Sequence, residues 1–102
     1  MDRHTDPRIK LALDPDTDPL ALASMAAMPK AHPLLLCAIA KNPRTDANTL
    51  DKLARYPDVA VRRWVAMHPH LPYEAFVHLS NDPDDSLQHK LRLGAHNFSV
   101  NG

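Results

Sequence analysis

The sequence predicts an all-α fold, a short α-solenoid of about three repeats, each built from two short helices. One observation is that ten prolines and only two glycines occur among 102 residues, with the prolines evenly spaced. Prolines at this frequency interrupt β-ladders, and strand-like alternation of polar and apolar residues is missing. Disorder is disfavoured because 44% of the residues are hydrophobic. A second observation is that apolar residues recur at helical spacing within each unit bounded by prolines.

Three prolines mark where the repeats begin, and each is followed by a second proline at the same distance along the chain. The pairs are Pro15 and Pro29, Pro43 and Pro57, and Pro69 and Pro83. Successive starts lie at nearly equal intervals, which is typical of repeat proteins. We therefore expect one domain over 1–102, with half a repeat at 1–14, repeats at 15–42, 43–68 and 69–96, and a short tail at 97–102.

The first helix of each repeat is predicted from an apolar stripe at i, i+3 and i+4. Three successive positions of this stripe, equivalent between the repeats, hold Leu22, Leu50 and Phe76, then Met25, Leu53 and Leu79, then Ala26, Ala54 and Ser80. Thr17 and Thr45 are expected to be N-caps, and Pro72 to lie in a first helical turn. The second proline of each pair should end this helix, because a residue before proline avoids the α region.

The second helix is predicted from the residues just before the next start. Apolar residues lie four positions before it and small residues three before it: Leu11, Ile39, Val65 and Leu93, then Ala12, Ala40, Ala66 and Gly94. One position before it lie polar residues that can bond to the backbone of a turn: Asp14, Asn42, His68 and His96. This helix is so short that we expect it to be partly 3₁₀. Helices of this length do not form alone, so neighbouring repeats must cover them.

These positions resemble the variant leucine-rich repeat family. Leu50-Asp51-Lys52-Leu53-Ala54 matches the first helix of its repeat, and the segment 61–69, Val-Arg-Arg-Trp-Val-Ala-Met-His-Pro, matches the second. The resemblance covers residues 5–97 and implies alternating α and 3₁₀ helices in a right-handed superhelix, related to HEAT and armadillo repeats. The chain departs from the pattern at Leu36, where arginine is usual. The single Cys37 also excludes the iron–sulfur segment that some relatives carry.

Cationic residues are the first candidates for a functional surface. Seven residues before each start lie Arg8, Leu36, Arg62 and Lys90, so stacked repeats would align three cations in a row. The cations nearby in sequence are Lys10, Lys41, Arg44, Arg63 and Arg92. Eleven of the twelve acidic residues are aspartates, concentrated in turns and helix starts. The cations therefore pair with these aspartates and keep neighbouring repeats in register, form a face for an acidic protein or a phosphate-bearing partner, or are ordinary solvated charges.

Aromatic, histidine and cysteine residues are the other candidates. Trp64 lies either at the edge of the core, partly buried, or exposed as an interface anchor, and partial burial is favoured. Tyr56 and Tyr73 are expected to pack on loop and helix surfaces. The seven histidines, including those on either side of Pro69, match no metal motif and suit caps and turns. Cys37 is expected to be a small buried hydrophobe.

The composition restricts the class of function. Formal charge is zero, the apolar run Leu34–Ala40 is too short to span a bilayer, and the first residues resemble no secretory signal. A cytoplasmic protein is therefore expected. No catalytic triad or phosphate loop is apparent, so we expect neither enzymatic activity nor a cofactor. The sequence favours protein binding through Arg62, Arg63 and Trp64. The alternatives are nucleic-acid binding along Arg8, Arg62 and Lys90, or a structural role through self-association.

Overall fold

The computed structural model describes residues 6–94, and over this range the chain forms seven α-helices and no strand. The helices are α1 (Pro7–Leu13), α2 (Pro19–Ala26), α3 (Pro33–Lys41), α4 (Ala47–Leu53), α5 (Val59–Ala66), α6 (Tyr73–Ser80) and α7 (Asp85–Leu93). The all-α prediction is confirmed. The predictions for residues 95–102, which include His96 and the tail, lie outside the described residues.

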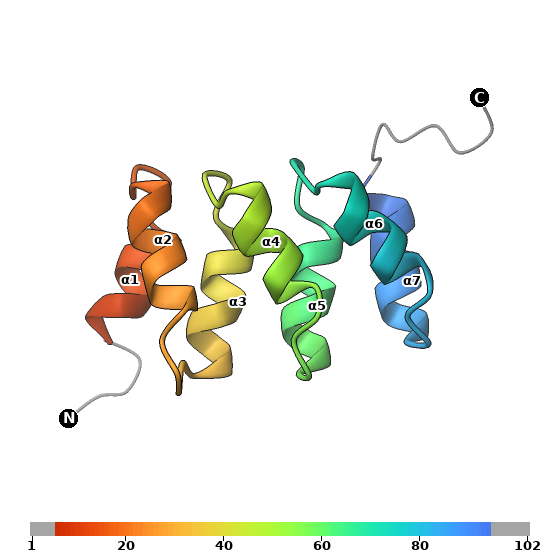
Figure 1. Cartoon of the computed structure of the whole chain (residues 1–102), viewed down its shortest axis with the longest axis horizontal. Helices are drawn as coiled ribbons and strands as arrows, with labels where there is room; N and C mark the ends of the chain where they lie inside the picture. The colour runs from red at the N-terminus through yellow and green to blue at the C-terminus, as the bar shows by residue number, and fades with distance from the viewer. Residues whose placement is uncertain (1–5, 95–102) are drawn as a thin grey trace.

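The helices pack in two layers. In one layer α1 contacts α3, α3 contacts α5 and α5 contacts α7, while α2, α4 and α6 form a second row (Figure 1). Each helix of the second row also packs against the helix that follows it in the chain. The molecule is accordingly elongated, with extents of 50 × 25 × 22 Å.

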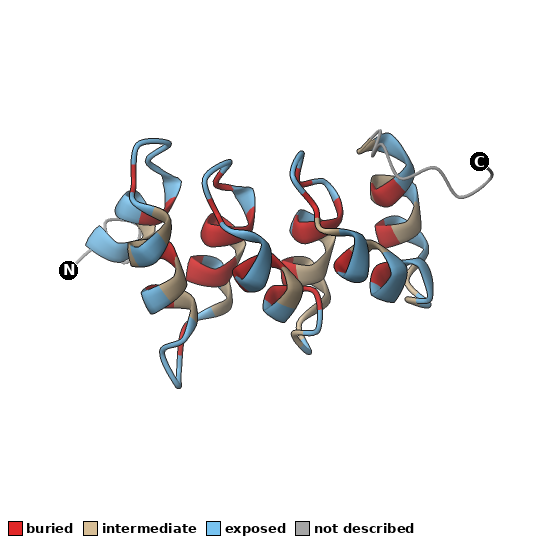
Figure 2. Cartoon of the chain, turned by 45° about the horizontal axis from the view of Figure 1, so that its top comes forward, coloured by how far each residue is buried: buried red, intermediate tan, exposed pale blue. Residues whose placement is uncertain are grey.

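The core lies between the two layers, and buried residues form stripes on the facing sides of the helices (Figure 2). The predicted stripe of the first helices is buried at Leu22, Met25, Leu50, Leu53 and Leu79. In the other layer the small residues Ala12, Ala40 and Ala66 are fully buried, which lets neighbouring helices approach closely.

Two residues of the predicted second stripe are not part of the core. Ile39 and Val65 are fully buried, but Leu11 is 46% exposed and Leu93 is 60% exposed. Leu11 lies on α1, which has a neighbour on one side only among the described helices. In α7 the prediction chose the wrong residue: counted from the first residue of each helix, Ile39, Val65 and Leu91 share one position, and Leu91 is buried.

The threonines expected as N-caps have a different role. Asp18 and Asp46 cap α2 and α4, and their carboxylates accept the backbone N–H groups of Leu20 and Thr49. The Thr17 hydroxyl instead donates to the Leu11 carbonyl at 2.6 Å, and Thr45 makes the same bond to Ile39 at 2.5 Å. A carboxylate is favoured next to the positive end of a helix, whereas a hydroxyl can donate to the unpaired carbonyls where a helix ends.

Two further details of the predicted helices need correction. Pro72 is itself the N-cap of α6 and not a residue of its first turn, and it provides no side-chain cap bond. The helices α1, α3, α5 and α7 are α-helical, not 3₁₀, and each begins with an i→i−4 bond: Lys10 to Asp6, Leu36 to His32, Arg62 to Asp58 and Gln88 to Asp84. Their first N–H groups are satisfied by side chains, which supports α geometry in short helices.

The N-caps of this layer are regularly spaced. They are Asp6, His32, Asp58 and Asp84, which follow one another at a constant interval, and each side chain accepts a backbone N–H of the first turn. His32 acts through Nδ1, which accepts from Leu34 N–H at 3.0 Å, as expected of a capping histidine. The spacing defines a frame in which equivalent residues of α1, α3, α5 and α7 can be compared.

Polar turn residues connect the ends of neighbouring helices. As predicted, Asp14, Asn42 and His68 each accept the N–H of the residue two positions later. The Asn42 amide also donates to the carbonyls of Ala12 and Asp14, both at 2.8 Å, and His68 Nε2 lies 2.8 Å from the Asn42 carbonyl. His68 Nδ1 accepts a hydrogen bond, so Nε2 must carry the hydrogen that is donated to Asn42. The turn at Asn42 is thus bonded to the turn at Asp14, and the turn at His68 is bonded in the same way to the turn at Asn42.

Candidate binding surface

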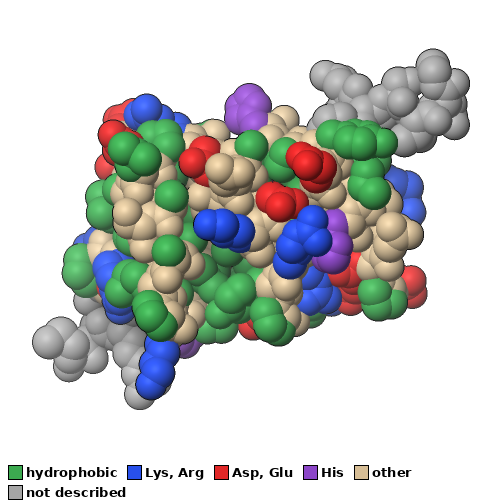
Figure 3. All heavy atoms as spheres, viewed as in Figure 1, with side chains coloured by type: hydrophobic (Ala, Val, Ile, Leu, Met, Phe, Trp, Pro, Cys, Tyr) green, Lys and Arg blue, Asp and Glu red, His purple; other side chains and the backbone are tan. Residues whose placement is uncertain are grey.

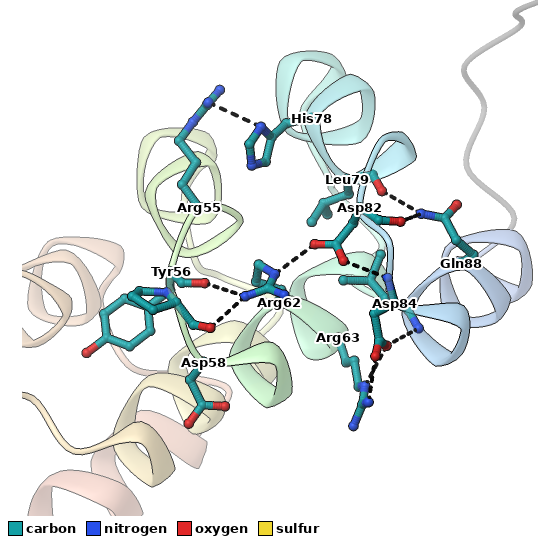
Figure 4. Close-up of polar contacts among 12 residues, drawn as sticks. Arg55, Tyr56, Asp58, Arg62, Arg63, His78, Leu79, Asp82, Asp84 and Gln88 are labelled. Carbon is teal, nitrogen blue, oxygen red and sulfur yellow. Dashed lines mark hydrogen bonds and ion pairs between the residues drawn. The ribbon is translucent and has the colours of Figure 1, made fainter.

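Arg62 is held inside the fold. Its Nε donates to Asp82 Oδ2 at 2.8 Å, and its Nη1 donates to the carbonyls of Tyr56 and Pro57, both at 2.8 Å (Figure 4). The side chains of Arg62 and Asp82 are only 17% and 7% exposed. Arg62 therefore connects α5 to the turn before it and to the segment between α6 and α7. This is the pairing with aspartate that the sequence suggested as one alternative.

Arg63 forms a two-pronged ion pair with Asp84, the N-cap of α7. Nε and Nη2 of Arg63 donate to the two carboxylate oxygens of Asp84, both at 2.9 Å. The hydrogen bonds from Arg63, and then the N–H of Leu87, lower the pKa of the Asp84 carboxyl below its ordinary value. The same carboxylate raises the pKa of the Arg63 guanidinium. About a third of the Arg63 side chain (35%) stays exposed beside the pair.

Lys90 does not occupy the position equivalent to Arg62, so the predicted row of cations does not form. Counted from the N-caps, the residue at Arg62's position is buried Leu36 in α3 and Gln88 in α7. Gln88 confirms the equivalence, because its Nε2 donates to the carbonyls of Leu79 at 2.8 Å and Asp82 at 2.9 Å, much as Arg62 binds carbonyls of its own preceding turn. The prediction counted seven residues back from the proline that starts the next repeat. This failed in the last unit because position 97, where that proline would lie, is asparagine.

Arg8, the other member of the predicted row, forms an ion pair with the N-cap of its own helix, Asp6. Its guanidinium lies 3.2 Å from the carboxylate of Asp6, which also accepts the Arg8 backbone N–H. These bonds lower the pKa of Asp6. Arg92, in the last turn of α7, is exposed. Arg8 is thus paired at the start of its own helix, Arg62 is bonded inside the fold, and Arg92 is exposed on the surface.

Trp64 is the centre of a surface shared by three helices. Trp64 is 40% exposed, which is the exposed alternative and not the partial burial that the sequence favoured, and Lys41 Nζ from α3 lies 4.6 Å from its ring centroid. A shallow hollow of about 220 Å³ lies beside the ring, lined by Ala60, Arg63, Trp64, Met67 and Lys90. Trp64 and Lys90 each follow an N-cap by six residues, so they occupy equivalent positions on neighbouring helices. We call these five residues together with Lys41 the Trp64 face.

Sequence reasoning named Arg63, Trp64 and Lys90 of this face and Lys41 as a nearby cation, but it missed Met67 and the contact of Lys41 with Trp64. A signal was present, since Lys41 and Met67 are separated by the same interval as the N-caps of α3 and α5, and each lies nine residues after its cap. Gln88, the equivalent of Arg62 in α7, was missed for the same reason, and Asp82 was not singled out from the other aspartates as the partner of Arg62. The repeats were counted from the prolines, whereas it is the N-caps of α1, α3, α5 and α7 that are separated by a constant number of residues.

The remaining candidate residues, Tyr56, Tyr73 and Cys37, do not form a site together. Tyr56 is half-buried against the core, and Tyr73 is exposed on α6. Cys37 is half-buried and not fully buried as expected, and burial raises the pKa of its thiol. Over residues 6–94, no three histidine, cysteine, aspartate or glutamate side chains are grouped so that they could hold a metal ion.

Comparisons of the chain with protein-family models, with curated proteins and with solved structures found no match. None of the helices in the described part of the chain has both the length and the apolar character needed to cross a membrane.

Proposed function

We propose that this protein is a short right-handed α-solenoid of about three two-helix repeats, similar to the variant leucine-rich repeats, and that it acts as a binding scaffold, not as an enzyme. The proposal is supported by the constant spacing of the N-caps Asp6, His32, Asp58 and Asp84, and by the repeated bonds between turns. Stacked helices hold surface side chains at set positions, so little conformational entropy is lost on binding.

The proposed partner is a protein, and the proposed contact surface is the Trp64 face. The observation that carries this proposal is the exposure of Trp64 among cations from three consecutive helices of one layer, Lys41, Arg63 and Lys90. Tryptophan and arginine are enriched among residues that dominate binding energy. Arg62, which the sequence placed on this surface, is excluded from it because its guanidinium is engaged inside the fold.

Nucleic-acid binding loses the geometric feature that suggested it. The row of Arg8, Arg62 and Lys90 is absent, and the formal net charge is zero. Acidic and basic side chains are also interspersed on the face formed by α2, α4 and α6 (Figure 3). A surface that tracks a phosphate backbone needs cations along its length, because each neutralised phosphate contributes to affinity.

Affinity capture from nuclease-treated lysate of the source cells tests the protein-binding proposal. The baits are the tagged wild type, Trp64→Ala, and Tyr73→Ala as a matched control that truncates an exposed aromatic on the other layer. We expect the same protein to be recovered with the wild type and with Tyr73→Ala, and to be lost with Trp64→Ala. Recovery that is equal with all three baits would remove the Trp64 face as the contact surface.

A further inference from the structure

Two surface residues differ in kind from their equivalents in the neighbouring units. Trp64 occupies the position held by Lys90 in α7. Leu20, two residues after the N-cap of α2, occupies the position held by Asn48 in α4 and Glu74 in α6. Leu20 is 75% exposed, the highest value among the exposed large hydrophobic residues. The positions equivalent to Leu20 are polar, so the packing of the helices does not require an apolar residue there, whereas the position of Trp64 is held in α3 by the buried Ala38.

Leu20 follows an acidic turn. Asp14, Asp16 and Asp18 lie on the turn between α1 and α2, and all three are exposed. The equivalent turns carry less negative charge: the turn before α4 contains Arg44 as well as Asp46, and the turn before α6 contains His70. We call the segment 14–20 the acidic turn. It combines three carboxylates with one exposed apolar side chain.

The Trp64 face has the complementary character. Its cations are Lys41, Arg63 and Lys90, and within residues 6–94 neither lysine forms an ion pair. Asp84, the ion-pair partner of Arg63, is engaged by Arg63 and by the Leu87 N–H. The hollow of about 220 Å³ is smaller than the usual small-molecule pocket, and its apolar lining suits one side chain of a protein.

We propose that the Trp64 face binds the acidic turn of a second copy of this chain, with Leu20 in the hollow and the aspartates beside Lys41 and Lys90. This inference rests on the proposed function of the face as a protein-binding surface and specifies its partner. One copy cannot make this contact within itself. The helices α1 and α2, which flank the acidic turn, pack against α3 and α4, while the hollow lies between α5 and α7 farther along the layer.

The contact is head-to-tail, because the two surfaces that meet are different. Every open assembly therefore keeps one unused acidic turn at one end and one unused Trp64 face at the other, and association continues until a ring closes. A single turn in a shallow hollow buries little area, so the association is expected to be weak and to need high protein concentration. It should also weaken with added salt, because exposed charges are screened.

Sedimentation velocity of the full chain from micromolar to millimolar concentration tests the proposal. The wild type should form species larger than 11.4 kDa that dissociate on dilution. Leu20→Asn, which installs the residue found at the equivalent position of α4, and Trp64→Ala should each stay monomeric. An equimolar mixture of these two variants should form a dimer and nothing larger, since together they retain one intact acidic turn and one intact face. Val77→Ala, which truncates an exposed apolar residue on α6 in the other layer, is the matched control and should associate like the wild type.

Fluorescence of Trp64, the single tryptophan, gives a second readout. Its emission should shift with concentration in the wild type and in Val77→Ala, and not in Leu20→Asn, whose surface change leaves the core intact. A wild type that stays monomeric at millimolar concentration overturns the proposal, as does a mixture of variants that forms no dimer. If the wild type is monomeric while capture from lysate still depends on Trp64, the face binds a different protein, and only the inference about the second copy fails.

Discussion

Replacing Arg62 with alanine tests whether this arginine belongs to the fold or to the surface. The substitution removes three hydrogen bonds of 2.8 Å, to the Asp82 carboxylate and to the carbonyls of Tyr56 and Pro57. Asp82 would keep its bond from the Asp84 N–H, and the exposed Pro57 carbonyl can bond to water. The principal loss is the ion pair with Asp82 and the part-buried bond to Tyr56, for which we expect about 2–4 kcal/mol of destabilisation.

Urea unfolding followed by circular dichroism measures this difference, and thermal unfolding should show a decrease in Tm of roughly 10–25 °C. Arg62→Gln should lose about half as much free energy, because a glutamine amide can bond to the carbonyls of the preceding turn as Gln88 does. Arg92→Ala is the control, since Arg92 is exposed. If Arg62→Ala changes the unfolding free energy by less than about 0.5 kcal/mol, the pair behaves as an exposed ion pair and Arg62 returns to the candidate surface.

Three further predictions concern the core, a turn and one ion pair. Leu53→Ala should destabilise the protein by about 2–5 kcal/mol in urea unfolding, because Leu53 is 2% exposed. A loss of unfolding free energy as small as that of Leu93→Ala, which truncates an exposed leucine, would place Leu53 outside the core. His68→Asn should be less destabilising than His68→Ala in thermal unfolding, since an amide can replace the bonds from the His68 ring to Asn42 and His70. Equal losses of stability in the two variants would show that these two bonds contribute nothing. The pKa of Asp84 is depressed in the folded state, so its pair with Arg63 should stabilise the protein above the ordinary value of 3.8 and lose this effect as the pH falls through the folded pKa. Carboxyl NMR titration should therefore give Asp84 a midpoint below 3.8 that rises in Arg63→Gln, and an unchanged midpoint in that variant would refute the assignment.

The regular proline spacing and the apolar stripes were sufficient to predict the helices. Leu22, Leu50 and Leu79 are buried as their spacing requires, and the segments 15–42 and 43–68 each contain two helices. These features are local, because an i, i+3, i+4 stripe and a proline act within a few residues of the chain. The same is true of the turn residues Asn42 and His68, which accept an N–H two positions away.

The roles of individual polar residues were harder to predict, because they depend on neighbours that are distant in the chain. Arg62 and Arg63 are adjacent in sequence, yet one bonds to Asp82 inside the fold and the other to Asp84 at its edge. Thr17 was expected to accept a cap bond and instead donates to a carbonyl of the preceding helix. Which partner a guanidinium or a hydroxyl finds is decided by the packing of helices that are well separated in sequence.

The amino-acid sequence by itself determined that this chain forms short helices between prolines and which face of each helix is apolar. Only the tertiary structure decided that Gln88 and not Lys90 is equivalent to Arg62, and that Lys41, Trp64 and Lys90 share one surface. The physical reason is that helix formation and amphipathicity follow from local sequence, whereas the register between stacked helices is set by side-chain packing and by bonds between turns. A two-residue error in counting a repeat moves a side chain about 200° around its helix, from one surface to another.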